Sequence, residues 1–165
     1  WPALPPPGPA GRPWIKEYAL LKGIDPLISP DLLRVLAQMG HGDEIVVADS
    51  NFPSVSVAAR TVTPQALRMD CDVIRALRAV LSLLPLDGFE PDPVLTMQIV
   101  GDPDTLPPPV VDSLPLFSAE GVAPKGIERF AFYDRAKAAF AVLQTAEPRP
   151  YACFILRKGV IFSSS

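Results

Sequence analysis

The stretch MGHGDEIVVADSNFP, residues 39–53, decides how this chain is organised, because it joins an expected helix to an expected strand. Apolar residues recur at helical spacing through residues 30–39, and IVVA, residues 45–48, is an apolar run of strand length. The only histidine of the chain, His41, lies in the turn between them. An imidazole titrates at about pH 6.5 and can exchange protons at neutral pH. This turn is therefore the first candidate for acid–base chemistry.

Carboxylates surround this histidine in the sequence, with Asp43 and Glu44 before the strand and Asp49 after it. A strand of four or five residues spans roughly 13–17 Å. His41 and Asp49 are therefore not expected to meet along one strand. Either the turn folds back, or another segment or a neighbouring subunit completes the site.

Helices and strands are expected to interleave along the chain, which favours an α/β layered domain. The expected helices cover residues 30–39, 72–84 and 130–138, and the expected strands cover residues 45–48, 94–100, 140–145 and 151–156. The last two strands suggest a hairpin. Residues 101–126 hold six prolines and three glycines, so we expect a loop with at most one short helix near residues 110–114.

Composition narrows the class of protein further. At 165 residues the chain is long enough for one domain, expected over residues 20–165, after a proline-rich disordered tail over residues 1–19. The net charge of −3 and the lack of a Lys/Arg cluster argue against nucleic-acid binding, and no apolar run is long enough to span a membrane. Two distant cysteines and one histidine indicate neither a disulfide framework nor a metal site, and a reducing cytosol is the default compartment.

The motif GHGDEI, with the AD and NFP that follow it, resembles the signature of the L-fucose mutarotase family, relatives of the ribose pyranases. The segments LISPDLLRVLAQM, LLPLD, RFAFYDRAKAAFAV and ILRKGV follow the family's order and approximate spacing, over roughly residues 21–160. The resemblance implies a three-layer sandwich with a central mixed sheet flanked by helices. It also implies an isomerase that interconverts the α and β anomers of L-fucose or a related monosaccharide without cofactor or metal. Members assemble as dimeric or ring-shaped homo-oligomers, so self-association is expected.

The same resemblance assigns roles to individual residues. His41 matches the catalytic proton donor, and Asp49 matches an aspartate that accepts hydrogen bonds from sugar hydroxyls. The other expected substrate-binding residues are Asp87, Arg129, Tyr133, Tyr151 and Cys153. Ordinary structural roles stay open for several of them: a strand-end cap for Asp49, a turn residue for Asp87, a half-buried aromatic for Tyr133 and a surface ion pair for Arg129.

The chain departs from the family pattern after its second tyrosine. The usual Tyr-Gly-Asn or Tyr-Ala-Asn is Tyr151-Ala152-Cys153 here, and a thiol is a poorer donor and acceptor than an amide. A protein of the same fold that binds or senses sugar without efficient turnover is therefore the alternative to an enzyme. An unrelated α/β domain in which His41 is incidental is the third possibility.

Overall fold

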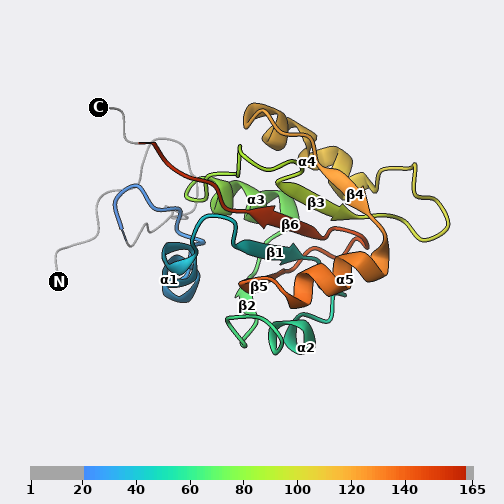
Figure 1. Ribbon diagram of the computed structural model, residues 1–165. Helices are drawn as coiled ribbons and strands as arrows, with labels where there is room; N and C mark the ends of the chain where they lie inside the picture. Colours follow the sequence, from blue (N-terminus) through green and yellow to red (C-terminus); the bar gives the residue numbers. More distant parts are fainter. Residues whose placement is uncertain (1–20, 163–165) are drawn as a thin grey trace, which may run out of the picture.

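The computed structural model describes residues 21–162, and the tail expected over residues 1–19 lies outside them. The described chain alternates helices with strands (Figure 1). In chain order the elements are α1 (Pro30–Gln38), β1 (Glu44–Ala48), α2 (Ser54–Ala58), β2 (Leu67–Met69), α3 (Val73–Leu81), β3 (Val94–Met97), α4 (Pro108–Ala119), β4 (Lys125–Ile127), α5 (Arg129–Lys137), β5 (Ala141–Thr145) and β6 (Phe154–Arg157). None of these helices is long and apolar enough to cross a membrane.

All six of these strands form one mixed sheet in the order β2-β5-β1-β6-β3-β4. The central strand β1 runs parallel to β5 and antiparallel to β6, with Val46 opposite both Val142 and Ile155. Every residue of β1 is buried, as expected for a strand covered on both faces.

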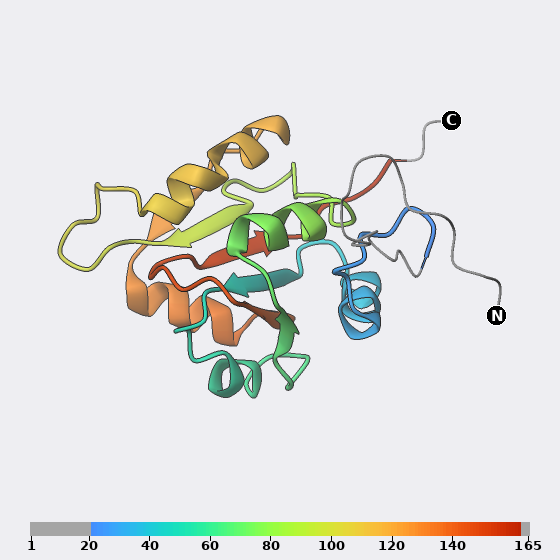
Figure 2. The ribbon, with the colours of Figure 1, turned by 180° about the vertical axis from the view of Figure 1, so that it is seen from behind.

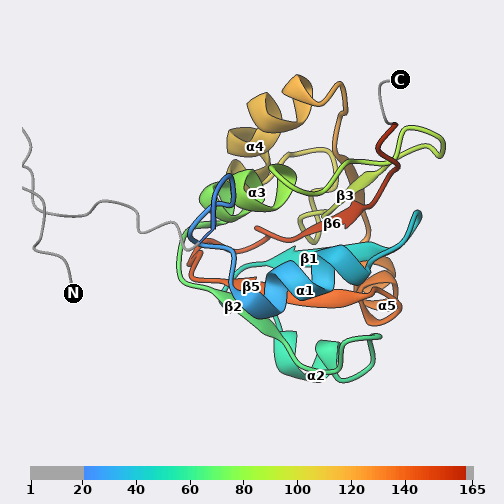
Figure 3. The same cartoon turned by 90° about the vertical axis from the view of Figure 1, so that its left-hand side faces the viewer.

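Helices cover both faces of the sheet, which confirms the expected three-layer sandwich. Figure 2, from behind, shows α3 in front of the sheet, and Figure 3 shows α3 and α4 on one side with α2 and α5 on the other. Each face of the sheet has its own hydrophobic core, and successive residues of β1 point into the two cores alternately. Ile45 and Val47 pack with residues of α1, α3 and α4, whereas Val46 and Ala48 pack with residues of α2 and α5.

The start of α1 is as the sequence predicts. The Ser29 hydroxyl caps the helix by accepting from Leu32 N at 3.1 Å, and Pro30 occupies its first turn. The last helical residue is Gln38, so the turn that carries His41 begins directly after the helix.

The expectation that β5 and β6 pair as a hairpin is wrong. In the sheet β1 lies between these strands, parallel to one and antiparallel to the other. The segment 146–150 therefore passes over the end of β1, where Glu147 O accepts from Ser50 N at 2.9 Å. A long connection across a central strand cannot be told from a wide hairpin by periodicity alone.

The proline-rich stretch 101–126 is more ordered than its composition predicts. Helix α4 has 12 residues rather than a short turn, with Pro115 inside it, and β4 adds an edge strand. A proline removes one N–H donor but need not end a helix when packing holds it, and Val110 and Phe117 on either side are fully buried.

Candidate functional site

A tight turn after α1 presents His41 to solvent. Asp43 Oδ2 accepts from Gly40 N at 2.7 Å, and Gly42 adopts a φ of +85°, which a residue with a Cβ rarely takes. Gly42 N also donates to Lys158 O at 2.9 Å, which ties the turn to the end of β6. The His41 side chain is 47% exposed, so a ligand can reach its imidazole.

The imidazole contacts one buried carboxylate. His41 Nε2 lies 3.1 Å from Asp87 Oδ1, and the Asp87 side chain has no exposed surface. Asp87 Oδ1 also accepts from Phe89 N at 3.0 Å, and the Phe89 ring meets the imidazole edge-on at 5.4 Å between centroids. The pair thus sits in a partly apolar setting that fixes the ring plane.

Asp87 stays ionised. The hydrogen bond from Phe89 N lowers the pKa of the Asp87 carboxyl more than burial raises it, and His41 and Arg157 lower it further. Asp87 Oδ2 is buried without a hydrogen-bond partner among residues 21–162, and Arg157 Nη1 stands 4.0 Å away. A carboxylate can only accept, so His41 Nε2 carries the hydrogen, and Nδ1 is the atom free to exchange a proton.

The other expected residues gather at a second place, a hollow of about 220 Å³ beyond the carboxyl end of β1. Its volume is below the ~300–1,000 Å³ typical of sites for drug-sized ligands, so it suits a smaller molecule. The residues that line it are Asp49, Asn51, Phe52, Met97, Arg129, Tyr133, Pro150, Tyr151 and Cys153. We call this the Asp49 hollow.

Asp49 is the hydrogen-bonding centre of the hollow. Its Oδ1 accepts from Asn51 N at 2.9 Å and Phe52 N at 3.0 Å, which makes Asp49 the cap of the turn after β1. Its Oδ2 accepts from Ala152 N at 3.2 Å and from Cys153 Sγ at 3.3 Å. These four donors match the roughly four acceptor sites of a carboxylate.

The Cys153 thiol is the weakest of these four donors. Burial raises the pKa of Cys153 well above its ordinary value, and the Asp49 carboxylate raises it further, so the thiol keeps its proton. Because an S–H group is a weak donor, Asp49 Oδ2 is the oxygen most open to a better hydrogen-bond donor.

One aromatic side chain, Tyr133, and one cationic side chain, Arg129, form part of the wall of the hollow. The Tyr133 ring stacks on Phe52 at 5.4 Å with the planes 9° apart, and burial raises the pKa of Tyr133. The Arg129 guanidinium lies 4.7 Å from the Phe130 ring centroid, and its Nε is buried without a hydrogen-bond partner in the described part of the chain. The surface ion pair left open for Arg129 does not occur there, and its Nε has no acceptor among the described residues.

Tyr151 closes the hollow with a strained backbone. Its φ is +61°, an uncommon conformation for a bulky residue. Its hydroxyl oxygen accepts from Val100 N at 3.3 Å. The phenolic hydrogen is then left to donate, so Tyr151 is set as a hydrogen-bond donor toward a ligand.

The structure brings most of the expected residues together, but not all. Asp49, Arg129, Tyr133, Tyr151 and Cys153 share the hollow. His41 and Asp87 lie beyond the other end of β1, and the turn does not fold His41 back to the hollow. Sequence reasoning missed Met97 in the hollow and Phe89 beside His41; both lie in ordinary apolar or turn contexts that carry no signal of a site.

No group of three or more His, Cys, Asp or Glu side chains that could hold a metal ion occurs within residues 21–162. With one histidine paired to a carboxylate, and one hollow lined by polar and aromatic side chains, the arrangement is suited to proton transfer on a small polar ligand.

Comparison with known proteins identifies the family of the chain. The model of the RbsD / FucU transport protein family matches residues 22–161. The fucose mutarotase of Bos taurus is 44% identical over 86% of this chain and 95% of its own length, and the L-fucose mutarotase of Actinobacillus pleuropneumoniae is 41% identical over 86% and 97%. The crystal structure of the fucose mutarotase of Streptococcus pneumoniae in complex with L-fucose superposes with a TM-score of 0.77, at 37% identity over 86% of this chain and 100% of that one. The chain therefore belongs to the RbsD / FucU transport protein family.

Proposed function

We propose that this protein is a sugar mutarotase that interconverts the α and β anomers of L-fucose, or of a closely related monosaccharide, without a cofactor. The observation that carries the proposal is the His41–Asp87 pair, an exposed imidazole held by a buried carboxylate. Relatives at 41–44% identity that are named fucose mutarotases support the reaction and the sugar.

The reaction needs only proton transfers. The imidazolium of His41 gives its Nδ1 proton to the ring oxygen of the sugar while the anomeric hydroxyl loses its proton to water. The bond between C1 and the ring oxygen breaks to give the open-chain aldehyde, C1 rotates, and the ring closes on the other face. On closure the hydroxyl that attacks C1 returns its proton to Nδ1 and the carbonyl oxygen takes a proton back from water, so nothing is oxidised or reduced. Positioned acid–base groups contribute about 10²–10⁴-fold, which suits a reaction that already proceeds in water.

In this scheme Asp87 binds the imidazole of His41 and not the sugar. Its Oδ1 is already engaged by His41 Nε2 and Phe89 N, so contact with the sugar, the role expected from the sequence, is the less favourable assignment. Because its carboxylate accepts from Nε2–H, Asp87 holds the imidazole with Nδ1 as the nitrogen that exchanges a proton. Asp87 is therefore the positioning residue of His41.

The Asp49 hollow is the proposed sugar site. Tyr151 donates to a sugar oxygen, the guanidinium of Arg129 in the lining of the hollow donates as well, and Asp49 Oδ2 accepts from a sugar hydroxyl that displaces the Cys153 thiol. Tyr133, stacked on Phe52, gives the hollow an aromatic wall against which an apolar face of the sugar can pack.

Two copies of the chain complete one site in our proposal, because His41 lies at the opposite end of β1 from the hollow. An exposed apolar surface adjoins His41: Phe89 is 64% exposed and Phe162 75% exposed, with their rings 6.1 Å apart. Self-association would cover these aromatics and bring His41 of one copy to the hollow of another. The unpaired thiols of Cys71 and Cys153 fit the cytosol as the compartment.

Cys153 favours one alternative function. If the missing amide weakens sugar binding or turnover, the protein would bind or sense a monosaccharide on the same fold without catalysing its interconversion. Sugar binding is common to the two functions, whereas turnover separates them.

Saturation-transfer NMR on equilibrated L-fucose tests the proposal, with the wild-type protein and His41→Ala side by side. We expect the wild-type protein to accelerate exchange between the anomer signals and His41→Ala to leave it at the rate in buffer. Folded wild-type protein that binds fucose without accelerating exchange would overturn the enzyme and favour the sensor. Ribose and galactose in the same assay set the specificity.

A further inference from the structure

The segment 146–150, which crosses the end of β1, is anchored from inside by one buried carboxylate. The Glu147 side chain is 2% exposed, although a glutamate is rarely buried unless its charge is compensated. Arg149 supplies the compensation with Nε at 2.7 Å from Oε1 and Nη2 at 3.1 Å from Oε2. Arg149 N donates to the same Oε1 at 3.1 Å, which curls the segment around the carboxylate.

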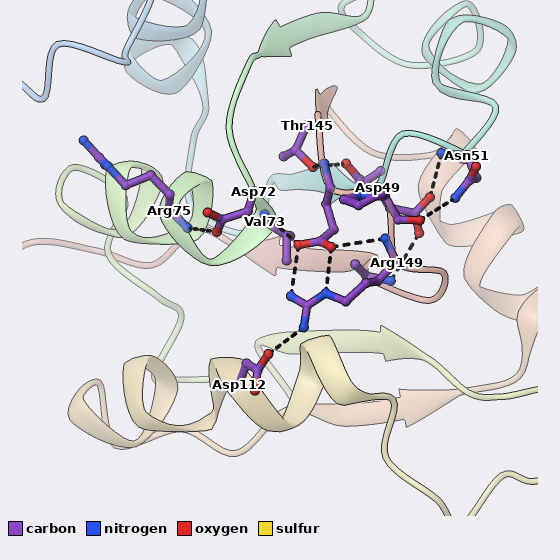
Figure 4. A network of polar contacts seen from close by, with 12 residues as sticks. Asp49, Asn51, Asp72, Val73, Arg75, Asp112, Thr145 and Arg149 are labelled. Carbon is purple, nitrogen blue, oxygen red and sulfur yellow. Dashed lines mark hydrogen bonds and ion pairs between the residues drawn. The ribbon is translucent and has the colours of Figure 1, made fainter.

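Glu147 also contacts helix α3 directly and helix α4 through Arg149. Its Oε2 accepts from Val73 N, in the first turn of α3, at 3.4 Å. Arg149 Nη1 in turn lies 2.7 Å from Asp112 Oδ2 on α4 (Figure 4). The segment is thus fixed to two helices on one face of the sheet.

The same segment holds the turn that carries Asp49. Glu147 O accepts from Ser50 N at 2.9 Å, and Pro148 O accepts from Asn51 Nδ2 at 3.3 Å. Figure 4 shows Asn51 and Asp49 beside Arg149 at this end of the sheet. Every contact of the segment with the Asp49 turn therefore depends on where Glu147 is anchored.

Pro150, the last residue of the segment, and Tyr151, the residue after it, both line the Asp49 hollow. The positive φ of Tyr151 is a conformation that persists only where its surroundings impose it. The anchored segment on one side and the bond from Ala152 N to Asp49 Oδ2 on the other impose it here.

We propose that Glu147, clamped by Arg149, is a positioning residue that sets Tyr151 and Asn51 at the wall of the sugar site. Glu147 does not line the hollow and contacts no ligand itself; it acts through the segment 146–150. This inference rests on the proposed function for its sugar readout but not for its structural readout.

Glu147→Gln tests the role. The amide keeps the volume and one acceptor oxygen, but cannot accept from Arg149 and Val73 with both oxygens. We expect the KM for the sugar to rise about tenfold while kcat changes less than twofold, because the hollow loosens and the His41–Asp87 pair at the other end of β1 does not. A merely structural role would lower the amount of folded enzyme and leave the KM of the remainder unchanged.

Asp25→Asn is the matched control. Asp25 makes a two-pronged ion pair with Arg75, at 2.7 and 2.9 Å, and does not contact the segment 146–150. We expect Asp25→Asn to lower the thermal midpoint without changing the KM. An equal KM for Glu147→Gln and the wild-type protein would overturn the proposal. If Glu147→Gln does not fold, Arg149→Lys, which keeps the charge but loses the planar fork, replaces it.

Amide hydrogen exchange gives a readout that needs no sugar. We expect Glu147→Gln to accelerate exchange at Ser50 N and Ala152 N, the two amides that tie the hollow together, and not at the amides of β6. Unchanged exchange at both amides would overturn the positioning role. A wild-type protein that does not turn over fucose would overturn the proposed function instead, and the exchange data would still decide the role of Glu147.

Discussion

His41 Nε2 and Asp87 Oδ1 lie 3.1 Å apart although 46 positions separate the residues in the sequence. The pair fixes which nitrogen of the imidazole is free, because an ionised Asp87 can only accept. Replacing Asp87 by Asn offers an amide that can satisfy either tautomer, so the hydrogen is no longer held on Nε2.

We therefore expect Asp87→Asn to lower kcat by about tenfold to a hundredfold with little change in KM. Saturation-transfer rates across a range of fucose concentrations give both constants. Asp70→Asn, at an exposed carboxylate paired with Arg68, is the control and should behave as wild type. A rise in KM without a fall in kcat would assign Asp87 to the sugar instead.

Mixing two inactive variants tests whether two copies build one site. His41→Ala removes the proton donor, and Arg129→Ala removes a donor from the hollow; each alone should be inactive or severely impaired. In randomly mixed oligomers about a quarter of the sites combine an intact His41 from one copy with an intact Arg129 from another. We expect co-refolded protein to recover about that fraction of the wild-type exchange rate.

The mixture should stay inactive if a single copy of the chain holds the whole site. If each chain contained a whole site, every chain in the mixture would carry one lesion and no activity would return. Each variant refolded alone provides the background rate.

Local chemistry explains why parts of the fold were predictable. The Ser29 cap and Pro30 begin α1 where the sequence predicts it, and the apolar run of β1 is buried along its whole length. Five residues of the Asp49 hollow (Asp49, Arg129, Tyr133, Tyr151 and Cys153) were also anticipated, but from the family resemblance rather than from local pattern. Capping and burial are properties of neighbouring residues, so a sequence displays them.

Features that depend on distant pairings were not predictable in this way. The insertion of β1 between β5 and β6 contradicts the expected hairpin, because strand order follows from the packing of the whole sheet. Pro115 suggested a loop, but buried neighbours keep α4 helical through it. The burial of Glu147 and its contacts with Val73 and Arg149 do not follow from the periodicity of the sequence.

Cys153→Asn tests what the departure from the family pattern does. An amide at this buried position can donate a stronger hydrogen bond than the thiol to a sugar oxygen. We expect fucose to bind more tightly by about 1 kcal/mol, or roughly fivefold, measured by titration calorimetry. Cys71→Ser is the control, because Cys71 does not line the hollow. Unchanged or weaker binding would mean that the thiol is already matched to the natural ligand.

Acidification should expose the contribution of Glu147 to stability. The hydrogen bonds from Arg149 lower the pKa of the Glu147 carboxyl below its ordinary value of 4.5, and those from Arg149 N and Val73 N lower it further. Below 4.5 the unfolded chain binds a proton that the folded chain resists, so stability falls as the pH drops through the folded pKa. The contribution is complete above pH 4.5. Asp25 and Asp87, whose pKa values lie below their ordinary 3.8, add to the same acid limb.

We expect Glu147→Gln to lower the free energy of unfolding by about 1–3 kcal/mol at pH 7, where the wild-type carboxylate is fully charged. The difference in the free energy of unfolding between the two proteins should shrink toward pH 3. Acid protonates Glu147 of the wild-type protein, and its side chain is then uncharged, as the glutamine is at every pH. Urea unfolding of both proteins at pH 7, 5 and 3 measures this. A difference that stays constant across the series would mean that Glu147 stabilises the fold through its shape and not through its charge.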